Sequence, residues 1–216
     1  MLVGEKMSKP VITLSKEMSI HDALALFKRE RIRRAPVVEA GKLIGIVSDK
    51  DLLNATPSQV TSLSVWEINY ALSKVTVREV MTRKVLTVQA DTPIEEAARL
   101  MADNKIGGLP VMRGENLVGI ITETDLFKAF LELLGGRSKG VRVTVLMDDH
   151  PGQLAKLTKA IADINGSFVS FGQFAGTGSQ TVNITFKVTG VTIDQIKDAL
   201  VQVVKEIVDI RECDPL

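Results

Sequence analysis

The chain contains an internal duplication. Residues 7–55 align without a gap with residues 81–129, so that every position lies 74 residues from its counterpart. The most similar stretches are GIVSDKD at 45–51 and GIITETD at 119–125. A repeat at a fixed spacing indicates one supersecondary unit used twice. The first part of the chain is therefore predicted to form a pair of related units.

Each repeat is predicted to alternate strands and helices. A short strand at 11–14 or 85–88 precedes a helix. Capping signals open these helices, Ser19 with Asp22 in the first repeat and Thr92-Pro93 with Glu95 in the second. Two apolar strands joined by a turn follow, and then a closing helix. Strands that are apolar throughout are buried on both faces, so helices must cover the sheet and the fold class is α/β.

The region after the repeats has a different order of elements. A polar hinge, GGRSKG, ends the repeat pattern. The remaining residues read as strand, helix, strand, strand, helix, strand, which is the ferredoxin-like βαββαβ arrangement of an α+β domain. The expected divisions are a first repeat at 1–60, a helical linker with Trp66 and Tyr70 at 61–74, a second repeat at 75–134, the hinge at 135–140 and the last domain at 141–216.

Composition excludes several classes of partner. The chain has 27 Lys and Arg against 26 Asp and Glu, a formal net charge of +1, which predicts no general attraction to nucleic acid or to an anionic membrane. The lone cysteine, Cys213, fits a reducing compartment. No secretory signal or membrane-length apolar run is present in the sequence, so we expect a cytoplasmic protein.

The two repeats together resemble a CBS-domain pair, a regulatory module that commonly binds adenosine-containing ligands. The motif that carries the resemblance is Gly, two apolar residues, Ser or Thr, two variable residues and Asp, and both copies have it. The resemblance implies that Asp51 and Asp125 accept hydrogen bonds from ribose hydroxyls, and that Ser48 and Thr122 donate to a phosphate. An ionised carboxylate has two oxygens and suits a diol in this role.

Other residues of the repeats fit the same ligand. A glycine without a Cβ would let a flat base approach the backbone, and a proline would stiffen the strand that borders it. The candidate nucleotide-binding residues are Arg34, Pro36, Gly45, Ser48, Lys50, Asp51, Gly108, Pro110, Gly119, Thr122 and Asp125.

A ligand-free interpretation stays open for the motif. Ser48-x-x-Asp51 and Thr122-x-x-Asp125 also match a capping box that opens the closing helix. A capping box explains the hydroxyl and the acid, but it does not explain the preceding glycines.

The repeats differ where phosphates would lie. The first has Arg31, Arg33, Arg34 and Lys50, whereas the second has Gly107-Gly108 and Glu123. We expect the first repeat to prefer longer phosphate tails and the second to accept a compact or uncharged tail. The ribose diol is common to AMP, ADP, ATP and S-adenosylmethionine, so the sequence leaves the ligand open among them.

Residues 140–213 resemble an ACT domain, a small-molecule sensing module often specific for amino acids. The resemblance implies a ligand at the first strand-to-helix turn, held between subunits. Backbone N–H groups there could receive a carboxylate. Alternatively, the proline begins a helix, Asn165-Gly166 ends it, and the domain only dimerises. The candidate amino-acid-binding residues are Asp149, His150, Pro151, Gly152, Leu154 and Asn165.

The complete order resembles AcuB-type proteins, which are associated with acetoin utilisation. The resemblance implies a regulatory protein. The sequence has no HExxH or CxxC motif, so we also expect no catalytic residues, metal or catalytic cofactor. Two functions stay open: an allosteric sensor that signals to an unidentified partner protein, and an assembly module that binds no ligand. In either case we expect a homodimer, because a sheet edge and a helical face are left to pair with a second copy.

Overall fold

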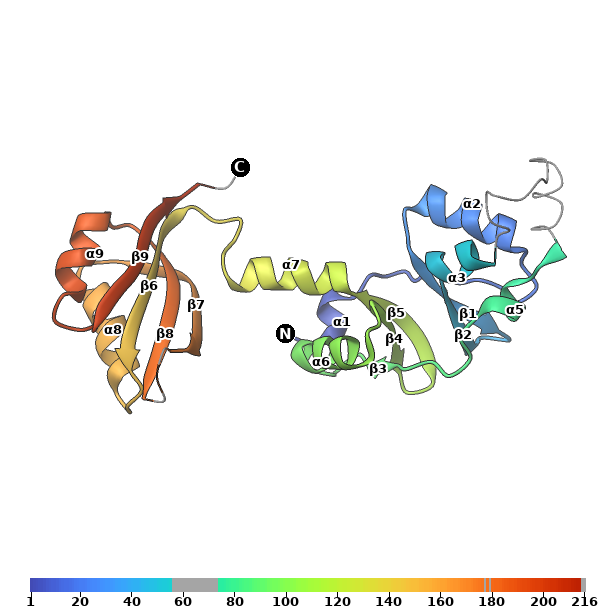
Figure 1. Ribbon diagram of the computed structural model, residues 1–216, viewed down its shortest axis with the longest axis horizontal. Coiled ribbons are helices and arrows are strands. Elements are labelled where there is room, and N and C mark those ends of the chain that lie inside the picture. Colours follow the sequence, from blue (N-terminus) through green and yellow to red (C-terminus); the bar gives the residue numbers. More distant parts are fainter. Residues whose placement is uncertain (56–73, 177, 179, 215–216) are drawn as a thin grey trace. The chain divides into compact units, whose positions relative to one another are not determined.

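A computed structural model describes residues 1–55, 74–176, 178 and 180–214 of the chain. The chain forms two compact units, Met1–Leu126 and Phe127–Leu216 (Figure 1). The boundary between them falls inside one helix, α7 (Glu123–Leu133). The predicted linker helix, with Trp66 and Tyr70, lies outside the described residues up to position 73.

The first repeat packs two helices against a two-stranded sheet. Its elements are α2 (Ile20–Glu30), β1 (Arg34–Glu39), β2 (Lys42–Ser48) and α3 (Asp49–Asn54). The Ser19 hydroxyl accepts a hydrogen bond from the Asp22 backbone N–H, so the predicted cap of α2 is present. The strand predicted at 11–14 is reduced to a single bridge between Leu14 and Val37.

The second repeat has the same elements and one more strand. These are β3 (Val88–Gln89), α6 (Ile94–Asn104), β4 (Gly108–Arg113), β5 (Asn116–Thr122) and α7, with the strands in the order β3-β4-β5. The predicted cap of α6 is wrong. Pro93 occupies the capping position, and the Thr92 hydroxyl instead accepts a hydrogen bond from the Gln89 N–H.

The two repeats exchange their leading segments. α1 (Val3–Lys6) precedes the first repeat, but Val3 is fully buried in the hydrophobic core of the second. α5 (Val77–Val80) precedes the second repeat, but Val77 is fully buried in the core of the first. Each leading segment then bridges to the last strand of the repeat on which it packs. This exchange brings residues from both repeats to each copy of the motif.

The C-terminal unit has the predicted βαββαβ order. Its strands form one antiparallel sheet in the order β7-β8-β6-β9, and α8 and α9 lie together on one face (Figure 1). Val143, Leu157, Phe186 and Ile196 are fully buried in the core between sheet and helices. The elements are β6 (Gly140–Asp148), α8 (Gln153–Asp163), β7 (Ser167–Ala175), β8 (Thr181–Thr189), α9 (Ile193–Leu200) and β9 (Glu206–Cys213).

A buried lysine fixes the segment that the sequence predicted as a hinge. Lys187, on β8, is only 4% exposed, and its ammonium donates hydrogen bonds to the carbonyl oxygens of Gly135 (2.7 Å) and Ser138 (2.9 Å). Gly135 follows the last turn of α7 and has a φ of 59°, the left-handed conformation common after a helix end. The ammonium therefore lies at the negative end of the helix dipole, where a cation is stabilising.

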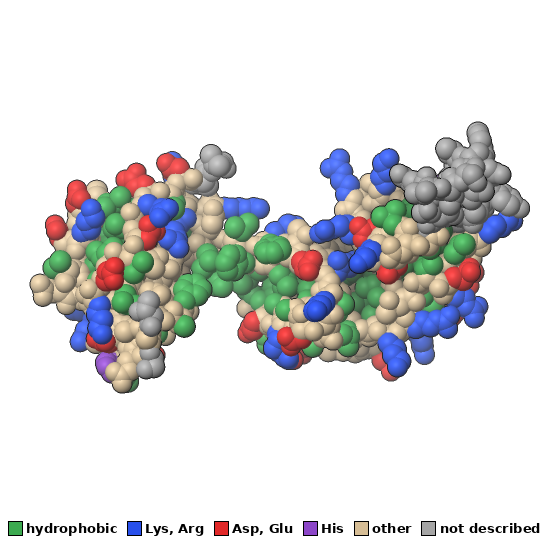
Figure 2. All heavy atoms as spheres, viewed as in Figure 1, with side chains coloured by type: hydrophobic (Ala, Val, Ile, Leu, Met, Phe, Trp, Pro, Cys, Tyr) green, Lys and Arg blue, Asp and Glu red, His purple; other side chains and the backbone are tan. Residues whose placement is uncertain are grey.

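The surface of the second unit leaves apolar side chains uncovered. Side chains of this kind gather over α7 in the space-filling view (Figure 2), and Phe127, Phe130 and Leu133 are each more than half exposed. Among the described helices, none combines the length and the hydrophobicity needed to cross a lipid bilayer.

Candidate functional site

A cavity of about 440 Å³ opens beside the first copy of the motif. The first repeat contributes Arg34 and residues 46–51, at the end of β2 and the start of α3. The second repeat contributes residues 82, 84–86 and 105–108, which come from two separate loops. The volume is within the range of small-molecule sites in proteins.

The lining of this cavity combines three kinds of side chain. Apolar side chains are contributed by both repeats: Ile46, Val47, Val85, Leu86 and Ile106. Ser48, Thr82 and the carboxylates of Asp49 and Asp51 provide polar groups, and the cations are Arg34, Lys50, Lys84 and Lys105. Apolar surface with a few convergent polar groups is the usual composition of a ligand site.

Asp51 has one carboxylate oxygen engaged and one open. Oδ2 accepts hydrogen bonds from the Ser48 backbone N–H (2.8 Å) and from the Ser48 hydroxyl (2.7 Å), and the Asp51 N–H returns a bond to that hydroxyl (3.3 Å). These contacts are the capping box of α3. Oδ1 has no hydrogen-bond partner within the described part of the chain. The capping role and a free acceptor beside the cavity therefore coexist in one residue.

Asp125, the counterpart of Asp51, is closed off. Its Oδ2 accepts from the Thr122 backbone N–H (2.9 Å) and hydroxyl (2.7 Å), as in the first repeat. Its Oδ1, however, accepts a long bond of 3.4 Å from the Ser8 hydroxyl, and the residue is only 6% exposed. Both copies of the motif therefore begin a helix with the same hydrogen bonds. They differ in the second carboxylate oxygen, which is without a partner in Asp51 and bonded to Ser8 in Asp125.

The glycines of the motif receive methionine side chains. A Cβ on Gly45 would lie 2.6 Å from Sδ of Met81, and a Cβ on Gly119 would overlap Sδ of Met7. Both methionines belong to the leading segments that cross between the repeats. The interpretation that these glycines admit a flat base is therefore wrong, because the space beside them is filled by protein.

The two candidate prolines lie inside strands of the two repeats. Pro36 is buried in β1, paired with Ile46, and Pro110 is buried in β4, paired with Ile120. Neither proline lines the cavity beside Asp51.

The cavity beside the first motif is lined by both repeats, so the phosphate-tail expectation for each repeat has to be applied to a shared site. Gly107 and Gly108 line the same cavity as Asp51, so they do not form a separate compact site beside Asp125. The side chain of Arg34 extends over both glycines: the space for a Cβ on Gly107 is occupied by its guanidinium and by the Glu123 carboxylate. Cations of the first repeat and the glycine pair of the second therefore line one composite cavity, and the preference of each motif for a ligand tail stays a prediction.

Arg34 is half-buried and without a direct partner. No hydrogen bond or ion pair to its guanidinium is found within the described residues. Burial lowers the pKa of Arg34 from its ordinary value, the charges of Glu123 and Asp49 oppose that shift, and Arg33 adds to it. Glu123 and Asp49 therefore interact electrostatically with the guanidinium of Arg34, but neither carboxylate forms an ion pair with it.

The candidate residues of the ACT-like unit lie at two ends of one helix. Asp149, His150, Pro151 and Gly152 precede α8, and all four are exposed, whereas Asn165 follows its last turn. A helix of 11 residues is about 16 Å long. One amino acid therefore does not reach both ends within a chain, and the predicted set is not brought together. The two groups are held apart in a single chain because α8 lies between them.

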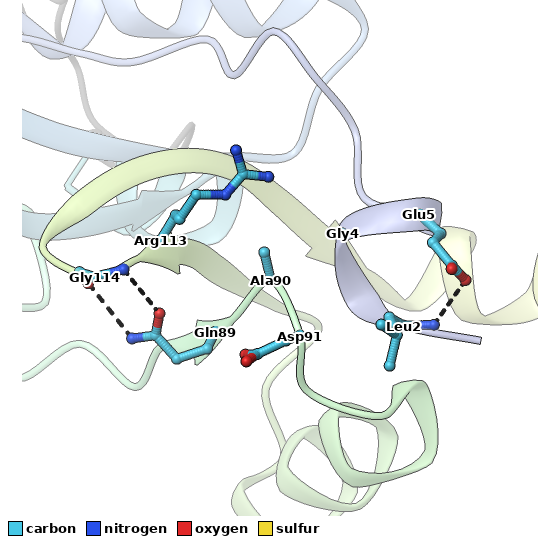
Figure 3. A pocket seen from close by; sticks show the side chains of 8 residues that line it. All are labelled: Leu2, Gly4, Glu5, Gln89, Ala90, Asp91, Arg113 and Gly114. Carbon is cyan, nitrogen blue, oxygen red and sulfur yellow. Dashed lines mark hydrogen bonds between the residues drawn. The ribbon is translucent and has the colours of Figure 1, made fainter.

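A second hollow, of about 460 Å³, lies on the second repeat (Figure 3). Two of its polar side chains, Gln89 and Glu5, already bond to backbone groups of the same lining. The Gln89 side chain accepts from the Gly114 N–H (3.1 Å) and donates to its carbonyl (3.4 Å), and Glu5 accepts from the Leu2 N–H (2.9 Å). No motif residue lines this hollow, so the cavity beside Asp51 is the candidate site.

Several residues of the candidate site were missed from the sequence. Lys84 and Lys105 enter the cavity from the second repeat, and Ser8 closes the second motif from the first. The places of Ser8 and Lys84 follow from the crossing of the leading segments, which no local pattern reveals. Among the described residues, no group of three or more His, Cys, Asp or Glu is arranged to hold a metal ion.

Comparison with protein families agrees with this architecture. The CBS-domain model matches residues 3–58 and 77–132, which together are more than half of the chain. The chain belongs to the CBS-domain family. A TTHA0829-like ACT domain model matches residues 139–211, so the CBS pair is followed by an ACT-like domain.

Similar proteins are found over the CBS pair. The CBS pair of MJ0100, solved in complex with 5′-methylthioadenosine and S-adenosyl-L-methionine, is 33% identical, covers 63% of this chain and 97% of that chain, and has a TM-score of 0.51. An acetoin utilization protein (AcuB) from Vibrio cholerae is 34% identical over 62% of this chain and 93% of its own, with a TM-score of 0.53. An L-aspartate semialdehyde sulfurtransferase from Methanocaldococcus jannaschii is 34% identical over 60% of this chain, which spans only 23% of that enzyme.

Proposed function

We propose that this protein is a non-catalytic regulatory sensor that binds an adenosine-containing ligand beside Asp51 and signals its occupancy to a partner protein. The observation that carries the proposal is the open Oδ1 of Asp51 at the cavity. A carboxylate oxygen without a partner at an apolar-flanked cavity is an acceptor for a hydroxyl-bearing ligand.

Each part of an adenosine ligand has a complementary part of the lining. Ile46, Val85 and Ile106 offer apolar surface to the base. Asp51 accepts from the ribose hydroxyls with Oδ1 while Oδ2 continues to cap α3. Ligand binding therefore does not require the capping box to open.

The comparison with MJ0100 supports the same class of ligand. That CBS pair is solved with 5′-methylthioadenosine and S-adenosyl-L-methionine, and both molecules contain adenosine. The likeness extends over most of the CBS pair of this chain at 33% identity. A link to acetoin utilisation rests on the likeness to AcuB, and the partner that receives the signal is unidentified.

We propose that the ACT-like domain binds an amino acid only between two subunits. One chain could supply the turn at Asp149–Gly152 and its partner the loop at Asn165, because the two groups are at opposite ends of α8 in a single chain. The exposed apolar side chains of α7 and the unpaired edge of β7 support the homodimer that this arrangement needs. An assembly module without ligands is the alternative, and saturable binding separates the two functions.

Titration calorimetry with adenosine, AMP and 5′-methylthioadenosine tests the proposal. Asp51→Asn keeps one oxygen for the capping box but replaces the second acceptor with an amide N–H₂. We expect the variant to bind each compound roughly ten- to hundredfold more weakly, as for loss of a charge-assisted hydrogen bond. Asp103→Asn, on the exposed face of α6, is the matched control. Equal affinities in Asp51→Asn and the wild type would leave only the capping role.

A further inference from the structure

Lys16 of the first repeat lies between two acidic side chains. Its ammonium forms ion pairs with Glu17 and with Glu39 at the end of β1, and its side chain is only 20% exposed. The Ser15 hydroxyl also donates to Glu17. Each of these three charged groups therefore has a partner of opposite charge within the repeat.

The second repeat has the same backbone at this place but different side chains. The N–H of Gly4 donates to the Ala90 carbonyl (2.8 Å). The counterparts of these residues, 74 positions further and 74 positions back, are Arg78 and Lys16, which form the same bond (3.0 Å). Because Ala90 stands where the first repeat has a lysine, no long side chain fills the place. The hollow of about 460 Å³ lies there (Figure 3).

The charged side chains around this hollow differ from those of the first repeat and lack partners. Asp91 is the counterpart of Glu17, whereas Arg113, the counterpart of Glu39, has the opposite charge. Both side chains are exposed, and no hydrogen bond or ion pair to either is found within the described part of the chain. One free carboxylate and one free guanidinium therefore line the hollow.

Glu5 adds a second carboxylate to the lining. Its Oε2 accepts from the Leu2 N–H (2.9 Å), and its Oε1 has no hydrogen-bond partner among the residues described. Asp91, Arg113 and Glu5 lie on different sides of Ala90, and none of the three is directed at another (Figure 3). The hollow therefore offers both kinds of charge at separate points of its lining.

We propose that this hollow binds a free α-amino acid, at a site separate from the candidate cavity of the CBS pair. The ammonium of the ligand pairs with Asp91 and Glu5, and its carboxylate meets the planar fork of N–H donors of Arg113. Leu2 and Ala90 offer apolar surface to its side chain. The volume is within the range of small-molecule sites in proteins.

Ligands with a single kind of charge fit this lining less well. An anion such as phosphate pairs with Arg113 but is repelled by two carboxylates, and a simple amine pairs with the carboxylates but is repelled by the guanidinium. A zwitterion places an opposite charge at each point. Because these groups are exposed, each pair contributes little, and we expect dissociation constants of about 1 mM.

An NMR titration of the full chain with leucine tests the inference, because the amides of Gly4, Ala90 and Gly114 report on this hollow locally. We expect saturable chemical-shift changes at these amides. N-acetylleucine lacks the ammonium and leucine methyl ester lacks the carboxylate. Each should bind roughly two- to fivefold more weakly than leucine, as for loss of one exposed charge pair.

The double variant Ala90→Lys/Arg113→Glu copies the first repeat into the second. The introduced lysine can pair with the introduced glutamate and with Asp91, so its side chain fills the hollow. We expect this variant to have a Tm equal to or above that of the wild type and to show no leucine shifts at Gly4 and Gly114. Shifts of the same size and affinity as in the wild type would contradict the proposed site.

Arg83→Met is the matched control. Arg83 is also exposed and without an ion pair in the described residues, but it does not line this hollow, so the leucine shifts should be unchanged. Arg113→Met should weaken leucine binding roughly two- to fivefold, and it decides the matter if the double variant unfolds.

Three results would overturn the inference. The first is the absence of saturable shifts at Gly4 and Gly114 in the wild type. The second is equal binding of leucine and its two derivatives, or equal binding of leucine by Arg113→Met and the wild type. The third is a set of leucine shifts confined to the turn at Asp149, which would place amino-acid binding in the ACT-like domain alone. None of these results bears on the binding of adenosine beside Asp51.

Discussion

Lys187 provides a quantitative test of how the ACT-like unit holds the end of α7. Its ammonium is 4% exposed and donates to two backbone carbonyls, at 2.7 Å and 2.9 Å. Lys187→Met keeps most of the aliphatic side chain and removes both bonds. A hydrogen bond to a charged group contributes about 1.5–3 kcal/mol, and the freed carbonyls regain some water because neighbouring residues of the loop are exposed. We therefore expect the free energy of unfolding to fall by about 2–4 kcal/mol.

Calorimetry and hydrogen exchange measure this effect. A change of 1 kcal/mol shifts the Tm of a domain of 60–100 residues by about 4–8 °C, so the Tm of the C-terminal unit should fall by about 8 °C or more. The amides of Gly136 and Ser138, which bond to the carbonyls of Leu131 and Gly135, should exchange faster. These two readouts separate a local loss of the anchored loop from a general loss of stability.

An exposed lysine of the same unit is the control. Lys205 pairs with Asp148 on the surface, with half of its side chain exposed, and such pairs contribute about 0–1 kcal/mol. Lys205→Met should therefore change the Tm little. If Lys187→Met and Lys205→Met unfold at the same temperature, and exchange at Gly136 is unchanged, then the ammonium does not anchor the loop.

Three further outcomes are expected. Asp125→Ala should lower the free energy of unfolding, measured in urea, by about 2 kcal/mol, because the partly buried donors of Thr122 lose their acceptor. It should leave the adenosine affinity unchanged, and an affinity loss equal to that of Asp51→Asn would contradict this. Gly45→Ala should cost about 1–3 kcal/mol because its Cβ meets Met81; an unchanged urea midpoint would argue against that contact. Light scattering at micromolar concentration should give twice 23.5 kDa, whereas the mass of one chain would contradict the homodimer.

The features predicted correctly from the sequence depend on short-range patterns. The order of the C-terminal elements follows from alternation along strands and a 3.6-residue period along helices. The cap at Ser19 and the capping box at Ser48 are signalled within four residues of chain, and both are present. The duplication gave the location of the candidate site because it needs only a comparison of the chain with itself.

The errors concern contacts between distant parts of the chain. Gly45 meets Met81, and Gly107 meets Arg34, because the repeats exchange segments. No local pattern in the sequence signals the burial of Lys187, because its partner Gly135 lies 52 residues away in the chain. The separation of Asp149 from Asn165, by contrast, was already implied by the predicted helix between them, since a helix of that length keeps its ends apart.

The repeated motif produces two equivalent helix starts and, we expect, one ligand site per chain. Two copies of a motif form equivalent ligand sites only if each copy is contacted by equivalent residues from the other repeat. Here Ser8 closes Asp125, while its counterpart Thr82 lines the open cavity and makes no bond to Asp51 among the described residues. The side chain of Arg34 extends from the first repeat over the second. Its counterpart in the second repeat is Gly108, which has no side chain that could extend over the first. Titration with ATP should therefore saturate at one molecule per chain in the wild type and lose that site in Asp51→Asn. Saturation at two molecules with similar affinity would refute this reasoning, because it would require Ser8 to release Asp125 at little cost.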